Sequence, residues 1–154
     1  MSIAPIVRSL IVKVEPDRAF DLFTSRIQDW WPKGKTIGRE PHVAVVIEPW
    51  VEGRWFERDA RGQETQWGKV LFWGPPHRLL LAWQIGADWA YHPELLTEVE
   101  LSFRAHVPGG TVVTLEHRYL ERLGADAARL REMLDGGWPT LLGEFQKITD
   151  NTEA

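Results

Sequence analysis

Apolar and polar residues alternate in short runs between His42 and His117, and tight turns separate one run from the next. In the clearest run, Val99, Leu101 and Phe103 point to one face of a β-strand, while the polar residues between them point to the other. The turn that follows, Pro108–Gly110, is too short for a crossover connection. Strands joined by such turns pair with their neighbours in antiparallel fashion, so this region predicts an antiparallel meander.

The same pattern predicts seven strands over the whole chain. They are expected at Ile3–Val14, Val43–Ile47, Gly53–Arg58, Gln66–Trp73, Arg78–Ile85, Thr97–Val107 and Thr111–His117. Two short helices are expected after the first strand: one begins at Pro16, since proline favours the first helical turn, and Pro32 ends the other. A loop over Gly86–Leu96 joins the fifth strand to the sixth.

The last part of the chain has helical periodicity. Its apolar side chains recur at spacings of three and four residues, at Leu130, Leu134, Trp138, Leu141, Leu142, Phe145 and Ile148. Pro139 removes one backbone donor and crowds the carbonyl of Asp135, and Gly136-Gly137 weakens the same turn. We therefore expect a kink at Pro139 or a break at the glycine pair. A curved sheet with one apolar face needs this helix as its cover, which predicts an α+β fold.

Length and composition exclude several classes of protein. The 154 residues suggest one domain, expected at 1–149, with a tail at 150–154. There is no cysteine, which excludes disulfides, thiolate metal sites and cysteine nucleophiles. The net charge of −4 and the scattered basic residues give no nucleic-acid-binding patch. No apolar run approaches the roughly 18 residues of a membrane span and no secretory signal opens the chain, so we expect a cytoplasmic location.

Catalytic and cofactor motifs are missing from the sequence. The five histidines lack metal-ligand spacing, and the chain has no Gly-x-Ser-x-Gly elbow, phosphate loop or dinucleotide fingerprint. The pair Glu98 and Glu100 falls on the outward face of its strand, where both carboxylates are expected to be solvated. The sequence therefore predicts no metal, no cofactor and no catalytic residue, and it favours a binding protein over an enzyme.

Nine tryptophans are more than a compact core of this size readily accommodates, because indole is large and its N–H group needs a partner when buried. Trp83 lies on the apolar face of its predicted strand, and Trp138 lies on the apolar stripe of the last helix. We expect an aromatic-lined cavity whose candidate ligand-binding residues are Trp31, Trp55, Trp67, Trp83, Trp89, Trp138 and Phe145. For any one tryptophan, the alternative is core packing or the anchoring of a loop.

Two polar residues share the inward face of their strands. His117 is a candidate for ligand binding or proton transfer, and the alternative is a core histidine with satisfied hydrogen bonds. Arg8 is a candidate anchor for an anionic ligand group. It could also pair with a buried carboxylate such as Glu57 or Glu116, and the alternative to a functional role is a structural ion pair or an outward-pointing arginine at a bulge.

Nine short motifs occur in a characteristic order along nearly the whole chain. They are Pro16–Phe23, Trp30–Trp31, Ile47–Pro49, Gly53–Phe56, Trp67–Val70, Pro75–Leu79, Thr97–Val99, Thr111–His117 and Gly137–Trp138. Together they resemble the SRPBCC (START-like) superfamily, in particular the branch named after the activator of the heat-shock protein 90 ATPase. One departure is Glu52 before Gly53, where many relatives carry two glycines.

The resemblance implies a helix-grip fold of the START/Bet v 1-like kind. In that fold a curved antiparallel sheet of about seven strands surrounds a long C-terminal helix, and a cavity opens between them. It implies no single activity, because relatives include co-chaperones, lipid carriers and polyketide cyclases.

The expected function is the binding of a small hydrophobic or aromatic ligand in the cavity. A protein-interaction module of the co-chaperone type, with a role in the stress response, is one alternative. A cyclase-like enzyme that uses the same cavity is another. The short strand Gly53–Arg58 is expected at a sheet edge, where pairing with a second copy would give a homodimer.

Overall fold

The computed structural model describes residues 2–152, and seven antiparallel strands form its single sheet. The strands are β1 (Ile6–Val12), β2 (His42–Ile47), β3 (Arg54–Asp59), β4 (Glu64–Gly74), β5 (Arg78–Trp83), β6 (Thr97–Ala105) and β7 (Thr111–Arg118). They lie in the order β1-β7-β6-β5-β4-β3-β2, so the meander from β2 to β7 pairs each strand with the next and β1 closes on β7. The predicted α+β fold class is confirmed.

Four helical segments complete the fold. They are α1 (Pro16–Thr24), α2 (Ile27–Trp30), the 3₁₀ helix η1 (Leu120–Asp126) and α3 (Ala127–Asp150). The two short helices after β1 are as predicted, with Pro16 in the first turn of α1. The sequence pattern did not predict η1. Of the expected tail, 150 ends α3 and 153–154 lie outside the described residues.

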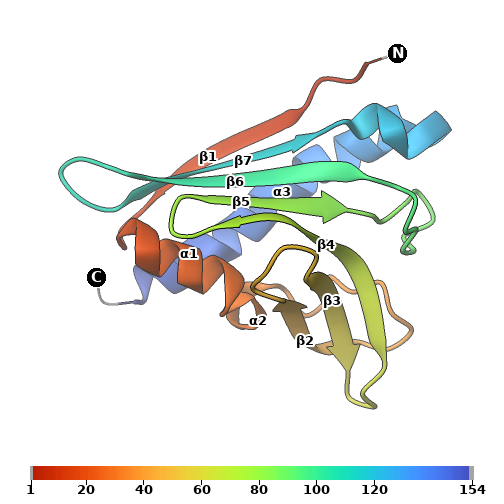
Figure 1. The fold of residues 1–154 in the computed structure, drawn as a ribbon, viewed down its shortest axis with the longest axis horizontal. Coiled ribbons are helices and arrows are strands. Elements are labelled where there is room, and N and C mark those ends of the chain that lie inside the picture. Colours follow the sequence, from red (N-terminus) through yellow and green to blue (C-terminus); the bar gives the residue numbers. More distant parts are fainter. Residues whose placement is uncertain (1, 153–154) are drawn as a thin grey trace.

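Helix α3 runs along one face of the curled sheet, as the helix-grip fold requires (Figure 1). The inward side chains of the central strands are fully buried beneath it, among them Leu101 of β6 and Leu115 of β7. From the helix, Leu130, Trp138 and Phe145 join the same apolar core. Among residues 2–152, no helix is both long enough and apolar enough to cross a lipid bilayer.

The expected break in the last helix is wrong, because α3 continues without interruption through Gly136-Gly137 and Pro139. Proline at 139 has no N–H group to donate to the carbonyl of Asp135. The Arg8 guanidinium of β1 takes up this role, with one nitrogen 3.4 Å from the Asp135 carbonyl oxygen and 2.5 Å from its carboxylate. Arg8 thus pairs with Asp135 of α3, rather than with Glu57 or Glu116.

The expectation that Gly53–Arg58 forms an edge strand is also wrong. Strand β3 pairs with β2 on one side and with β4 on the other, so its backbone groups are used within the sheet. The two edges of the sheet are β1 and β2. Alternation alone identified β3 as a strand, but it could not show which strands lie beside it.

Strands β4 and β5 approach each other closely at Gly68. A Cβ atom built at this position would lie 1.7 Å from the carbonyl oxygen of Ala82, so only glycine fits there. The register of β4 against β3 shifts beside the same point, between Trp55 and Phe56. This irregularity accompanies the bend of β4 seen in Figure 1, and it sets the position of the neighbouring Trp67.

Candidate ligand pocket

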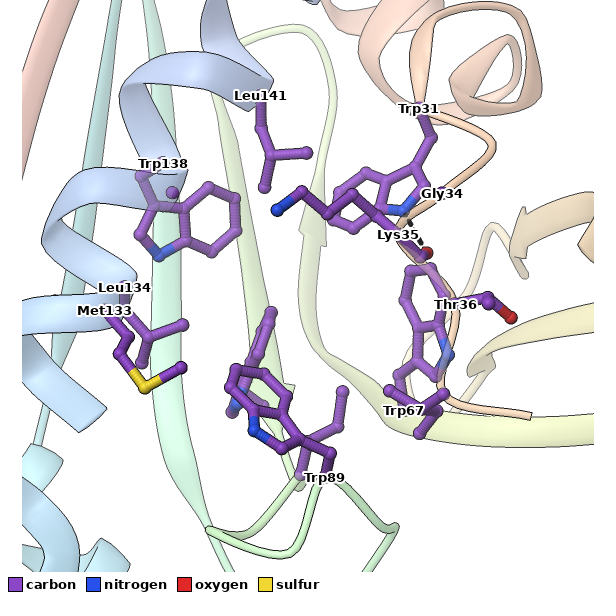
Figure 2. A pocket seen from close by; sticks show the side chains of 14 residues that line it. Trp31, Gly34, Lys35, Thr36, Trp67, Trp89, Met133, Leu134, Trp138 and Leu141 are labelled. Carbon is purple, nitrogen blue, oxygen red and sulfur yellow. Dashed lines mark hydrogen bonds between the residues drawn. The ribbon is translucent and has the colours of Figure 1, made fainter. Parts of the chain in front are cut away.

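A pocket of about 240 Å³ opens between α3, the bent sheet and two loops. Figure 2 shows indole rings on several sides of it, with aliphatic side chains of α3 between them. Five of the lining residues, here called the pocket tryptophans, come from five different segments of the chain. They are Trp31 after α2, Trp67 in β4, Trp83 in β5, Trp89 in the β5–β6 loop and Trp138 in α3.

The rings of the pocket tryptophans pack against one another and against the core. Trp31 and Trp67 lie with ring centroids 4.9 Å apart, and Trp83 meets Trp138 edge-on at 5.7 Å. Trp55 lies behind them with 1% of its surface exposed, in contact with Trp31, Trp67 and Trp83. Such contacts stabilise aromatic pairs by about 0.5–1.5 kcal/mol beyond their area burial, so the wall is held in place.

Trp89 differs from the other four because it is 38% exposed and has a left-handed backbone, with a φ of 56°. It lies at the mouth of the pocket, on the loop between β5 and β6 (Figure 2). An isolated bridge between Ile85 and Tyr91 and a contact of 2.9 Å between His92 and Asp88 hold this loop. The hydrogen bond to the Asp88 carboxylate raises the pKa of His92 and so favours the protonated ring in this contact.

The buried carboxylate of Glu57 fixes one side of the pocket. It accepts a hydrogen bond of 2.9 Å from the Trp67 indole and one of 2.7 Å from the backbone N–H of Ile37, and the Thr36 hydroxyl donates to it as well. Only 1% of Glu57 is exposed. The carboxylate therefore ties the loop of residues 34–37 to a pocket tryptophan, a role that the sequence did not reveal.

His117 fixes the opposite side of the pocket. The Trp138 indole donates to its Nδ1 at 3.2 Å, so Nε2 carries the proton and donates to the Thr97 hydroxyl at 2.9 Å. Thr97 in turn donates to the backbone carbonyl of Trp83 at 2.9 Å. Burial lowers the pKa of His117 to about 3, so the ring is neutral. This chain of three hydrogen bonds connects the two tryptophans of the β5 and α3 walls.

The candidate residues from the sequence thus divide into two groups. Five of the six candidate tryptophans line the pocket. Outside its wall, Trp55 and His117 lie buried behind the rings, Phe145 packs on Phe23 and Trp30, and Arg8 pairs with Asp135 at the helix. The sequence analysis missed the loop of residues 34–37, because an irregular segment after a proline carries no periodic signal.

The chemistry of the wall is apolar. Among the described residues that line the pocket, Lys35 is the only charged one and Thr36 the only one with a hydroxyl group. Three of the indole N–H groups are already bonded within the protein, that of Trp31 to the Lys35 carbonyl at 3.0 Å. The pocket therefore presents mainly ring faces and edges to a guest. Within residues 2–152, no group of three His, Asp or Glu side chains is placed to hold a metal ion.

The sequence profile described as "Activator of Hsp90 ATPase homolog 1-like protein" matches residues 13–150. The chain belongs to this family. The match confirms the resemblance found in the short motifs, and it makes the chain an AHSA1-like member of the SRPBCC superfamily. No curated protein matches the chain at a significant level.

Solved structures similar to this AHSA1-like protein include two with appreciable sequence identity. The anthrahydroquino-γ-pyrone synthase Txn09, solved in a complex, is 35% identical with a TM-score of 0.68, over 96% of this chain and 97% of that one. The self-sacrificing resistance protein CalC from Micromonospora echinospora is 28% identical with a TM-score of 0.73, over 96% and 94%. The Aha1 dimer from Colwellia psychrerythraea shares the fold alone, at 14% identity and a TM-score of 0.60 over 94% of both chains.

Proposed function

We propose that this AHSA1-like protein binds a small, flat, largely apolar molecule between its pocket tryptophans. The observation that carries the proposal is the convergence of five indoles from five chain segments on one pocket. Aromatic side chains around a concave site supply apolar contact area and stacking faces to a planar guest. Hydrogen bonds that the indoles of Trp67 and Trp138 donate to Glu57 and His117 hold these two rings in place, which lowers the entropic cost of binding.

The volume of the pocket suggests the size of the guest. About 240 Å³ lies between the roughly 150 Å³ of an engineered cavity that binds benzene and the roughly 300 Å³ at which sites for drug-sized ligands begin. Two or three fused rings are therefore the expected size. The open mouth beside Trp89 would allow a longer molecule to extend into solvent.

A similar protein supports a guest of this kind. Txn09 is described as an anthrahydroquino-γ-pyrone synthase, a name that implies a fused aromatic product. CalC is described as a resistance protein. Both are over 25% identical to this chain and span nearly all of it, and from Txn09 we transfer the handling of a small molecule, without a specific substrate.

The geometry favours binding over proton transfer by His117. Both ring nitrogens of His117 are hydrogen-bonded, the side chain is fully buried, and its pKa of about 3 makes it a weak base. No imidazole and no carboxylate is among the described lining residues. We therefore assign His117 to the positioning of Trp138.

Tryptophan fluorescence tests the proposal, with naphthalenemethanol as a neutral probe of the expected size. We expect saturable quenching in the wild type and affinity weakened about 3- to 10-fold by Trp89→Ala, since one aromatic contact is lost. Trp50→Ala is the matched control, because Trp50 is 55% exposed and does not line the pocket. Absence of quenching across neutral fused-ring probes, and no small molecule found by native mass spectrometry of the purified protein, would contradict the proposal.

A protein-docking role is the second candidate, and one observation favours it. Val7 and Ile11 point outward from the edge strand β1 with about half of their surface exposed, 49% and 52%. Apolar side chains on an edge strand can contact a partner. Stimulation of an Hsp90 ATPase by the wild-type protein, lost in a Val7→Lys/Ile11→Lys variant, would support this role. An unchanged ATPase rate would contradict it.

A further inference from the structure

We infer that the guest of the pocket carries an acidic group that is ionised at neutral pH, such as a carboxylate, and that Lys35 pairs with it. The inference rests on the proposed function and specifies the class of ligand. It starts from the distribution of charge around the pocket. Lys35 is the only charged residue on the described wall, and the remaining side chains are aromatic, aliphatic or hydroxylic.

The Lys35 ammonium group lies where an anionic group of a guest in the pocket can reach it. In Figure 2 the side chain extends from the loop across the pocket toward Trp138 and Leu141, with its nitrogen at the leading end. Lys35 is exposed, so the ammonium stays hydrated until a guest arrives. A planar guest held between the rings would therefore present its outer edge to this cation.

The protein supplies no competing anion at this place. Among the lysines of residues 2–152, Lys69 forms a salt bridge with Glu52 and Lys147 forms one with Glu144, whereas Lys35 has no carboxylate partner. No carboxylate belongs to the described wall, so an anionic guest would meet no like charge there. Glu57 is occupied by its own donors behind the loop. The pocket thus has one unpaired positive charge beside an apolar interior.

The backbone that carries Lys35 is fixed on both sides. Its N–H donates to the Pro32 carbonyl at 3.0 Å, and its carbonyl accepts from the Trp31 indole at 3.0 Å. Two residues further on, the Ile37 N–H is held by Glu57 at 2.7 Å. The ammonium therefore moves only through its own flexible side chain, and it remains within reach of the pocket. A lysine of this kind acts as a compact point charge for an anionic group.

The experiment compares two probes of nearly equal shape, naphthoate and naphthalenemethanol, by fluorescence titration at neutral pH. The wild type should bind naphthoate more tightly than the alcohol, and added salt should reduce this difference. Lys35→Gln should weaken the binding of naphthoate by about fivefold, which corresponds to an exposed ion pair of about 1 kcal/mol. It should leave the affinity for the alcohol unchanged. Lys33→Gln is the matched control, because Lys33 is also exposed but does not line the pocket.

The outcomes separate this inference from the proposal beneath it. Equal affinity of the two probes in wild type and Lys35→Gln would overturn the role of Lys35 while the pocket still binds aromatic guests. Equal losses in Lys33→Gln and Lys35→Gln would also overturn it, because the effect would then come from general surface charge. Binding of neither probe would overturn the proposed function and this inference together.

Discussion

At the scale of single residues, the tryptophans of this protein show how a large amphipathic side chain can serve as a fixed wall. The indole N–H groups of Trp31, Trp67 and Trp138 donate to a backbone carbonyl, a carboxylate and an imidazole, respectively. Because a buried N–H group needs a partner, these bonds restrict how each ring can turn. The polar end of each side chain is held within the protein, and its apolar body forms the pocket wall.

His117 allows a prediction on stability against pH. Its pKa in the folded protein, about 3, lies below the ordinary value of 6.5, so the unfolded chain binds one more proton between these two pH values. Stability is therefore complete above about pH 6.5 and is lost as the pH falls, by up to about 1.4 kcal/mol per pH unit for this group. Burial also lowers the pKa of His42, which adds in the same direction.

The measurement is chemical denaturation of the wild type and His117→Gln between pH 7 and 5, above the range in which most carboxylates titrate. The variant should be less stable at pH 7, because the bonds to Trp138 and Thr97 are weakened, but its stability should fall less steeply with acid. His106→Gln, a change outside the core, should retain the wild-type slope. Parallel slopes for wild type and His117→Gln would contradict the assignment.

At the scale of elements, α3 shows how a helix can continue through a proline. Proline inside a helix leaves one carbonyl without its donor, here that of Asp135, which lies four residues before Pro139. Arg8 reaches this carbonyl from β1, and it pairs with the Asp135 carboxylate at the same time. The sequence showed the missing donor but could not show its replacement, because Arg8 lies 127 positions away in the chain.

A double-mutant cycle tests this arrangement. Pro139→Ala should stabilise the protein by about 2 kcal/mol, since it removes a cost near 3 kcal/mol but gives the unfolded chain more freedom. Arg8→Ala should lower the free energy of unfolding by about 1 kcal/mol, because the ion pair is partly exposed. In the Pro139→Ala background the same substitution should cost clearly less. Asp135→Asn removes the charge but keeps the carbonyl, which separates the two contacts. Strictly additive effects in urea denaturation would contradict the role of Arg8 at the carbonyl.

The sequence predicted the positions of the strands along the chain better than their order in the sheet. Alternation and tight turns located β6 and β7 to within about two residues at each end, because one face of each strand is buried and the other is not. That signal carries no information on strand order, and β3 was expected at an edge although β2 covers it. The 3₁₀ helix η1 escaped prediction because its short turn around Gly124 lacks helical periodicity.

At the scale of the whole molecule, the pocket is a product of the long-range assembly. Its wall combines segments from Trp31 to Trp138, which meet only because α3 packs along the curled sheet (Figure 1). The alternation of residues along the strands identified the inward-pointing tryptophans, but it could not show which of them reach the pocket and which are buried behind it. Trp55 and Trp67 are both buried, yet only Trp67 lines the pocket. Glu57 and Lys35 could not be found from the sequence, because their roles depend on what folds around them.

The central claim is that a flat aromatic guest enters between the pocket tryptophans, and the indole N–H resonances of ¹⁵N-labelled protein test it most directly. Each of the nine tryptophans gives one such signal. Upon addition of naphthoate, the signals of the five pocket tryptophans should shift with saturation, whereas those of Trp50 and Trp73, which do not line the pocket, should stay in place. Unchanged indole signals, or shifts confined to Trp50 and Trp73, would contradict the claim.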